Sequence, residues 1–122
     1  MYRVVLADDS EEFLAWLRSA LENTGDFLPV GQAANGVDAI QLIARLVPDV
    51  AIIDVDMPEL DGLDVAEWVR RQALPTKVVV VTAHTDRAYA SLADQAGAFA
   101  FIPKAALSVD TLRDALKPAE AS

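Results

Sequence analysis

The sequence predicts a doubly wound α/β fold, in which helices cover both faces of a parallel sheet. Three observations support this prediction: alternating apolar and amphipathic segments, an unbroken run of valines, and short connections. Short apolar runs alternate five times with amphipathic stretches along the chain. The run from Val78 to Val81 is an unbroken series of valines, as expected for a strand that is covered on both faces. The connections are short, which favours strict alternation of strands and helices around one sheet.

The apolar runs predict five strands, over residues 2–7, 27–34, 50–54, 77–82 and 98–103. Helical periodicity predicts five helices between and after them, around residues 13–21, 37–47, 65–69, 89–96 and 109–116. Gly25 follows the end of the first helix, Pro48 ends the second, and Ser108 can cap the fifth. The inward-facing stripe expected for the first helix comprises Phe13, Trp16, Leu17, Ala20 and Leu21. For an open sheet of this size, the expected strand order is the flavodoxin-like 2-1-3-4-5.

The length of 122 residues predicts one domain, over residues 1–117, with a polar tail over residues 118–122. This tail is either a frayed end or the start of a linker. Hydrophobic residues make up 53% of the chain, as in ordinary globular proteins. The apolar run Val4 to Ala7 is broken by Asp8 and is too short for the core of a signal peptide. We therefore expect a cytoplasmic protein without a membrane segment.

Composition excludes several kinds of site. The chain has no cysteine, which excludes disulfides and thiolate chemistry. Its single histidine, His84, cannot by itself make a zinc site of the usual nitrogen and sulfur type. The formal net charge of -9 argues against direct binding of nucleic acid by this domain.

The residues that end the predicted strands form a chemically complementary set. The first strand runs into Asp8 and Asp9, the third ends in Asp54, the fourth in Thr82, and the fifth runs into Lys104. In open parallel sheets, ligands bind outside the carboxyl ends of the strands. We therefore expect three carboxylates, a hydroxyl and an ammonium group to meet at one edge of the sheet.

This concentration of carboxylates predicts a cation. Two like charges about 4 Å apart at a protein surface repel by roughly 4 kcal/mol. Oxygen ligands suit a hard divalent ion, and Mg²⁺ is the usual choice where phosphate is handled. Lys104 would supply a compact positive charge and Thr82 a hydroxyl donor. A nucleophilic carboxylate, a metal, a cation and a hydroxyl together are what phosphoryl transfer to aspartate requires.

Four segments carry a resemblance to a known family. The segment IIDVDMPELDG, residues 52–62, resembles the phosphoacceptor strand and loop of response-regulator receiver domains, the CheY-like domains of two-component signalling. The segments VVLADDS (residues 4–10), VTA (81–83) and GAFAFIPK (97–104) are similar to the remaining signatures of that family. The resemblance covers nearly the whole chain, and the FIPK sequence is similar to receivers of the LuxR/NarL type.

The resemblance implies a role for each acidic residue. Asp54 would accept a phosphoryl group from a phosphohistidine of a sensor histidine kinase or a histidine phosphotransfer protein. Asp9 would bind Mg²⁺ directly, and Asp8 would act through a coordinated water. The backbone carbonyl of Asp56 would complete the protein ligands of the metal.

The same resemblance implies how the phosphoryl group is held and sensed. Thr82, the backbone amide of Ala83 and Lys104 would contact its oxygens. Thr82 and Phe101 would form the switch, and the output face would cover the fourth helix, fifth strand and fifth helix, about residues 86–117. Phe101 stands where many receivers have tyrosine, so it is also interpreted as a core aromatic residue. Asp56 and His84, beside the entrance, would modulate access to the site.

The implied protein is a signalling switch and not an enzyme acting on external substrates. Its partners would be the phosphodonor and an effector outside this chain, for example a helix-turn-helix DNA-binding domain, and a homodimer could form on phosphorylation. Lys104 is followed by Ala105 where many receivers have proline, so we expect a differently shaped loop.

Three alternatives are considered. The spacing of Asp54 and Asp56 also matches the nucleophile and acid of haloacid-dehalogenase-like phosphatases, although that motif belongs on the first strand. A flavodoxin-like cofactor binder is disfavoured, because the acidic segment after the first strand, residues 8–12, would repel a flavin phosphate. A degenerate receiver that binds a partner constitutively would normally lack one of the site residues, and none is missing.

Overall fold

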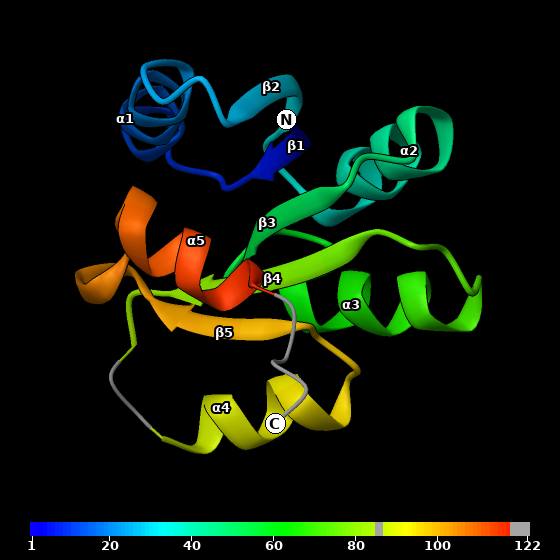
Figure 1. Cartoon of the computed structure of the whole chain (residues 1–122). Coiled ribbons are helices and arrows are strands. Elements are labelled where there is room, and N and C mark those ends of the chain that lie inside the picture. The colour runs from blue at the N-terminus through cyan, green and yellow to red at the C-terminus, as the bar shows by residue number, and fades with distance from the viewer. Residues whose placement is uncertain (85–86, 118–122) are drawn as a thin grey trace, which may run out of the picture.

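The computed structural model describes residues 1–84 and 87–117 and forms one five-stranded parallel sheet with helices on both sides (Figure 1). The strands are β1 (Tyr2–Ala7), β2 (Phe27–Ala33), β3 (Val50–Asp54), β4 (Lys77–Thr82) and β5 (Ala100–Pro103). Their order is β2-β1-β3-β4-β5, and all neighbouring pairs are parallel. The predicted α/β class and strand order are therefore confirmed.

Five α-helices connect and follow the strands: α1 (Glu11–Glu22), α2 (Gly36–Leu46), α3 (Gly62–Arg71), α4 (Ala88–Gln95) and α5 (Val109–Leu116). A short 3₁₀ helix, η1 (Lys104–Ala106), lies between β5 and α5. Four of the five helices begin with a side chain that accepts a backbone N–H bond: Ser10, Asn35, Asp61 and Ser108. Arg87, the residue before α4, does not cap that helix with its own side chain.

Alternation along the strands divides the core between the two faces of the sheet. In β1, Val4 and Leu6 face α1 and α5, whereas Val5 and Ala7 face the helices on the opposite side. The first cluster takes its helical residues from α1 and α5: Leu14, Leu17, Leu21, Leu112 and Leu116. The second takes them from α2, α3 and α4: Ala39, Ile43, Val65, Ala66, Val69 and Ala93. Within the described residues, no helix is both long and apolar enough to span a membrane.

The inward face of α1 differs from the prediction. Trp16 is half-exposed, and Leu14 is buried in its place together with Leu17 and Leu21. The spacing of Leu14, Leu17 and Leu21 fits the 3.6-residue period as well as the predicted stripe does, and these side chains fit the space above β1. Strands β2 and β5 are shorter than predicted, since β2 ends at Ala33 and β5 begins at Ala100.

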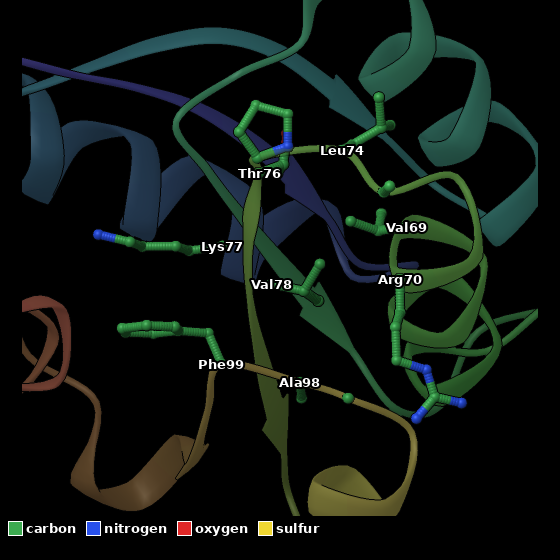
Figure 2. A pocket seen from close by; sticks show the side chains of 11 residues that line it. Val69, Arg70, Leu74, Thr76, Lys77, Val78, Ala98 and Phe99 are labelled. Atoms are coloured by element: carbon green, nitrogen blue, oxygen red, sulfur yellow. The ribbon is translucent and has the colours of Figure 1, made fainter.

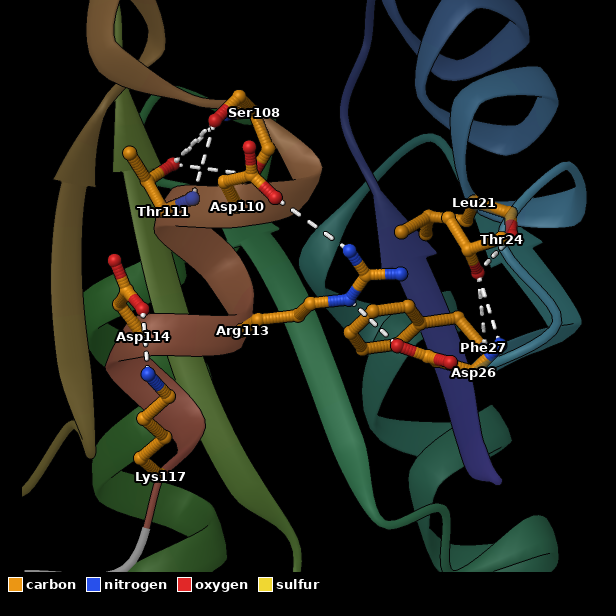
Figure 3. A network of polar contacts seen from close by, with 10 residues as sticks. All are labelled: Leu21, Thr24, Asp26, Phe27, Ser108, Asp110, Thr111, Arg113, Asp114 and Lys117. Atoms are coloured by element: carbon orange, nitrogen blue, oxygen red, sulfur yellow. Dashed lines mark hydrogen bonds and ion pairs between the residues drawn. The ribbon is translucent and has the colours of Figure 1, made fainter.

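Polar contacts fix α5 beside the start of β2 (Figure 3). Ser108 caps α5, as predicted, and forms a reciprocal capping box with Thr111. Arg113 reaches across from α5 and pairs through Nε with Asp26 Oδ2 at 2.5 Å. Because this ion pair is largely exposed, its contribution to stability is small, and α5 depends mainly on the burial of its leucines.

Candidate functional site

The predicted site residues lie together at the carboxyl edge of the sheet. Ala7 is in register with Ile53, Asp54 with Val81, and Thr82 with Pro103. Asp8 follows β1, Asp54 and Thr82 end β3 and β4, and Lys104 follows β5. The parallel register therefore brings residues almost a hundred positions apart in sequence to one place.

Three carboxylates form the centre of this edge. Asp8, Asp9 and Asp54 each offer an oxygen atom, and these atoms all lie within 4.8 Å of one another. Asp8 and Asp54 are only 1% and 3% exposed, whereas Asp9 is exposed to solvent. Two of the three carboxylates are thus held close together away from water, an arrangement that opposes their both being charged.

The pKa of Asp54 reflects this environment. It is raised from 3.8 to about 6, first by burial and then by the negative charge of Asp8, while the Lys104 ammonium acts in the opposite direction. Asp54 Oδ1 is buried and has no hydrogen-bond partner within residues 1–84 and 87–117. A buried carboxylate oxygen without a donor is costly unless a cation or another ligand satisfies it.

Lys104 is the cation nearest to these carboxylates. Its Nζ lies 2.6 Å from Asp8 Oδ2 and 3.6 Å from Asp54 Oδ2. The shorter contact is an ion pair outside the angles of a hydrogen bond, since Asp8 Oδ2 has no such bond among the described residues. The Lys104 ammonium also lies 4.2 Å from the centre of the Phe13 ring, which favours a cation.

The acidic centre fits a divalent metal. Three carboxylates converge there, and Asp54 Oδ1 is an unsatisfied buried acceptor. Hard divalent cations prefer oxygen ligands of this kind. The Lys104 ammonium alone cannot neutralise three carboxylates, so a bound cation would offset the remaining negative charge.

Thr82 and Phe101 occupy different positions relative to the carboxylates. The Thr82 side chain is fully buried, and its Oγ1 accepts the backbone N–H of His84 at 3.0 Å. Phe101 is half-buried and packs against the core on the α2, α3 and α4 side. Ala83 follows Thr82 and is exposed.

His84 and Asp56 contact each other from the loops that follow β4 and β3. His84 Nε2 lies 2.6 Å from Asp56 Oδ2, and both side chains are about half-exposed. The imidazole also stacks on Tyr89 of α4, with ring centres 5.1 Å apart. Sequence reasoning placed His84 and Asp56 near the entrance but interpreted Tyr89 only as part of a helical stripe. The aromatic pair at residues 84 and 89 is visible in the sequence, but their contact depends on the loop that joins β4 to α4.

A separate cavity lies at the opposite edge of the sheet (Figure 2). It has a volume of about 530 Å³ and lies beside the end of α3 and the start of β4, with Val69, Leu74 and Val78 among its apolar lining residues. None of its lining residues carries a carboxylate. Within residues 1–84 and 87–117, the cluster of three carboxylates lies at the carboxyl edge, as the sequence predicted, and this cavity is not part of it.

Comparisons with known proteins agree with this geometry. Residues 4–117 match the response regulator receiver domain family. The uncharacterized transcriptional regulatory protein YvfU of Bacillus subtilis is 36% identical over 117 residues, which cover 96% of this chain and 58% of that protein. The probable transcriptional regulatory protein NarL of Mycobacterium tuberculosis is 41% identical over 102 residues, which cover 84% of this chain and 47% of that protein. The chain thus spans roughly half the length of these relatives.

Solved structures show the same similarity. The signal receiver domain of the putative response regulator NarL from Mycobacterium tuberculosis has a TM-score of 0.87 and 36% identity, with 96% of this chain and 98% of that chain covered. A LuxR-family DNA-binding response regulator from Staphylococcus aureus also has a TM-score of 0.87, with 28% identity and coverage of 95% and 96%. The chain belongs to the response regulator receiver domain family of two-component signalling, and it is similar to receivers of the NarL/LuxR type.

Proposed function

We propose that this domain is a phosphorylation-controlled switch in which Asp54 accepts a phosphoryl group from a phosphohistidine. The observation that carries the proposal is the position of Asp54, which is buried beside Asp8, near Lys104, and has one oxygen without a hydrogen-bond partner in the described part of the chain. The donor would be a sensor histidine kinase or a histidine phosphotransfer protein. The domain would act as a signalling switch and not as an enzyme on external substrates.

In the transfer step, an Asp54 carboxylate oxygen forms a bond to phosphorus as the bond between phosphorus and the donor imidazole nitrogen breaks. The electron pair of the broken bond stays on that nitrogen, and with a proton on the other ring nitrogen the donor leaves as neutral imidazole. The carboxylate must be ionised to attack, and above about pH 6 most of Asp54 is ionised. The contribution of the domain is to position the reactants and to offset their charge.

Mg²⁺ is the cofactor that we propose for this step. Asp9 and Asp54 would bind the ion directly, Asp8 through a water molecule, and Asp56 through its backbone carbonyl. When bound, the ion would supply positive charge that offsets the phosphoryl oxygens and the clustered carboxylates. The convergence of three carboxylates and the unpaired Asp54 Oδ1 support this assignment.

The phosphoryl oxygens would be held by the cation and donors beside Asp54. Lys104 would contact one of them, and the Thr82 hydroxyl and the Ala83 backbone N–H would donate to the others. The Thr82 Oγ1 accepts a bond from His84, which leaves its own proton available for donation. Asp56 and His84 would modulate access from solvent.

Signal output would pass through the face formed by α4, β5 and α5. Thr82 would move toward the phosphoryl group, and the Phe101 ring would turn inward behind it, which shifts the population between two states. In support, α4 fully buries only Ala93, whereas each of the other four α-helices fully buries at least two residues, so α4 has the smallest anchor in the core. An effector domain of the helix-turn-helix DNA-binding kind would receive this change, and a homodimer could form on phosphorylation. The site of action would be the cytoplasm.

Incubation with acetyl phosphate and Mg²⁺, followed by intact mass measurement, tests the proposal. We expect the mass of one phosphoryl group on the wild-type chain, dependent on Mg²⁺, and none on Asp54→Asn. Asp26→Asn is the matched control, because Asp26 is an exposed aspartate that pairs with Arg113 away from this site, and its labelling should equal that of wild type. Equal labelling of Asp54→Asn would place the nucleophile elsewhere.

The same preparation distinguishes the switch from a phosphatase. A receiver should become modified once and return slowly to its free form. Release of many phosphate ions per chain from a phosphomonoester would contradict the proposal and favour a haloacid-dehalogenase-like phosphatase.

A further inference from the structure

A close contact between two side chains joins two of the loops beside the Asp54 site. Asp56 lies in the loop that follows β3, and its backbone N–H faces the Asp54 carboxylate. His84 lies in the loop that follows β4, two residues beyond Thr82. The contact of 2.6 Å between His84 Nε2 and Asp56 Oδ2 therefore bridges the entrance from one loop to the other.

Two further contacts fix the position of His84. Its backbone N–H donates to Thr82 Oγ1 at 3.0 Å, which ties its main chain to the end of β4. Its ring lies almost parallel to that of Tyr89, at an interplanar angle of 14°. Tyr89 belongs to the first turn of α4 and packs partly against the core on the α2, α3 and α4 side. The half-exposed imidazole is thus held against a ring that is itself anchored in the fold.

We propose that Tyr89 is a positioning residue, whose ring holds the Asp56–His84 pair across the entrance and slows hydrolysis of the phosphoryl group on Asp54. This inference rests on the proposed function of Asp54. Tyr89 would act only through His84, without touching the reacting atoms.

Hydrolysis explains why such a pair should matter. A water oxygen forms a bond to phosphorus as the bond between phosphorus and the Asp54 oxygen breaks. The electron pair of that bond stays on the Asp54 carboxylate, and both protons of the water leave with the inorganic phosphate as H₂PO₄⁻. The attacking water must enter from the solvent side, where the Asp56 and His84 side chains meet. Without the Tyr89 ring, the imidazole would sample more rotamers, and the entrance would be open for a larger fraction of the time.

The experiment measures loss of the phosphoryl group from Asp54 by intact mass, after acetyl phosphate has been removed and with Mg²⁺ present. We expect Tyr89→Leu to hydrolyse about twofold to tenfold faster than wild type, the factor that matches the strength of an aromatic pair. Tyr89→Phe keeps the stacked ring and should restore the wild-type rate. Leu92→Ala, at an exposed position one turn further along α4, is the control for a general loosening of that helix and should also match wild type.

A double-mutant comparison tests whether Tyr89 acts through His84. In a His84→Ala background, Tyr89→Leu should cause no further change in the hydrolysis rate. Equal rates for wild type and Tyr89→Leu would overturn the inference while leaving Asp54 as the acceptor. An unchanged effect of Tyr89→Leu in the His84→Ala background would also overturn it, because Tyr89 would then act through α4 alone. Absence of any phosphoryl group on the wild-type chain would instead contradict the proposed function.

Binding of beryllofluoride, followed by NMR, shows that each variant keeps a folded site, and Asp56→Asn tests the other end of the pair if a Tyr89 variant does not fold.

Discussion

Lys104 lies closer to Asp8 than to Asp54: its Nζ is 2.6 Å from Asp8 Oδ2, compared with 3.6 Å from Asp54 Oδ2. The Lys104 ammonium is thus nearer to Asp8, which is slightly more buried than Asp54. Asp54 keeps an oxygen without a hydrogen-bond partner in the described part of the chain. In this state Lys104 offsets the charge of the acidic centre. Its proposed contact with a phosphoryl oxygen would require the ammonium group to move toward Asp54.

Replacement of Lys104 by methionine should destabilise the protein. Removal of one partner from a buried ion pair leaves a buried charge, and we expect the free energy of unfolding to fall by about 3 kcal/mol at neutral pH without divalent cations. Urea unfolding measures this change. Lys77→Met is the matched control, because the Lys77 ammonium lies over the Phe99 ring and pairs with no buried carboxylate among residues 1–84 and 87–117, so its loss should be under about 1 kcal/mol. Equal losses in the two variants would show that Lys104 does not offset the buried charge.

The pH dependence of stability should reveal Asp54. Its pKa is raised by burial from 3.8 to about 6, so the native state binds this proton more tightly than the unfolded chain does. The favourable contribution is complete below about pH 4 and is lost as the pH rises through about 6. Asp54→Asn removes this dependence and should raise the free energy of unfolding by up to about 3 kcal/mol near pH 7.5, but by less than about 1 kcal/mol near pH 4.

Urea unfolding of wild type and Asp54→Asn at several pH values, with a chelator present, measures the difference. Asp26→Asn changes the charge equally at an exposed position and serves as the control. A gain in stability of Asp54→Asn that does not vary between about pH 4 and 7.5 would mean that the raised pKa is not the cause.

Magnesium should stabilise the native protein through Asp9. A ligand that binds only the folded state raises the midpoint of thermal unfolding, and the rise grows with its concentration. Asp9→Asn should weaken Mg²⁺ binding on the order of tenfold, because it removes a charged oxygen ligand. Glu11→Gln removes the same charge from the first turn of α1, two residues along the chain, and should bind Mg²⁺ like wild type. An equal loss of Mg²⁺ affinity in Asp9→Asn and Glu11→Gln would show that the effect comes from net charge and not from a direct ligand.

Gly36 should tolerate no side chain. A Cβ atom at this position would lie 2.1 Å from the backbone oxygen of Leu60, in the loop between β3 and α3. Gly36→Ala must displace that loop or α2, and we expect a loss of about 3 kcal/mol in the free energy of unfolding. Gly31→Ala is the control, because its Cβ would meet only the Leu42 and Leu46 side chains at 3.4 Å, and it should change stability by less than about 1 kcal/mol. Similar losses in the free energy of unfolding for Gly36→Ala and Gly31→Ala would show that the loop containing Leu60 moves at little cost.

Much of the fold and of the acidic centre could be predicted from the sequence. The valines of β4 and the strand-terminal positions of Asp8, Asp54 and Thr82 were informative, because parallel strands place their carboxyl ends at one edge whatever the details of packing. Single-sequence periodicity could not decide between Leu14 and Trp16 as the inward residue of α1. That choice depends on the volume available above the sheet, which is set by side chains from distant segments.

Contacts made by loops were also beyond prediction. His84 and Asp56 were expected near the entrance, but their direct pairing and the stack on Tyr89 depend on how two loops turn in space. The 3₁₀ helix that begins at Lys104 is a similar case, since the sequence indicated only that this loop would differ from the Lys-Pro form. Side-chain periodicity carries no information about such irregular backbone.

Because Asp8, Asp54, Thr82 and Lys104 come from the ends of four strands, the site exists only when β1, β3, β4 and β5 have paired in their correct register. No fragment of the chain that lacks β1 or β5 would hold Asp8, Asp54 and Lys104 at their present separations. Acceptance of a phosphoryl group would therefore report the integrity of the entire domain. A damaged or incompletely folded copy of the domain would therefore not be phosphorylated and would produce no output.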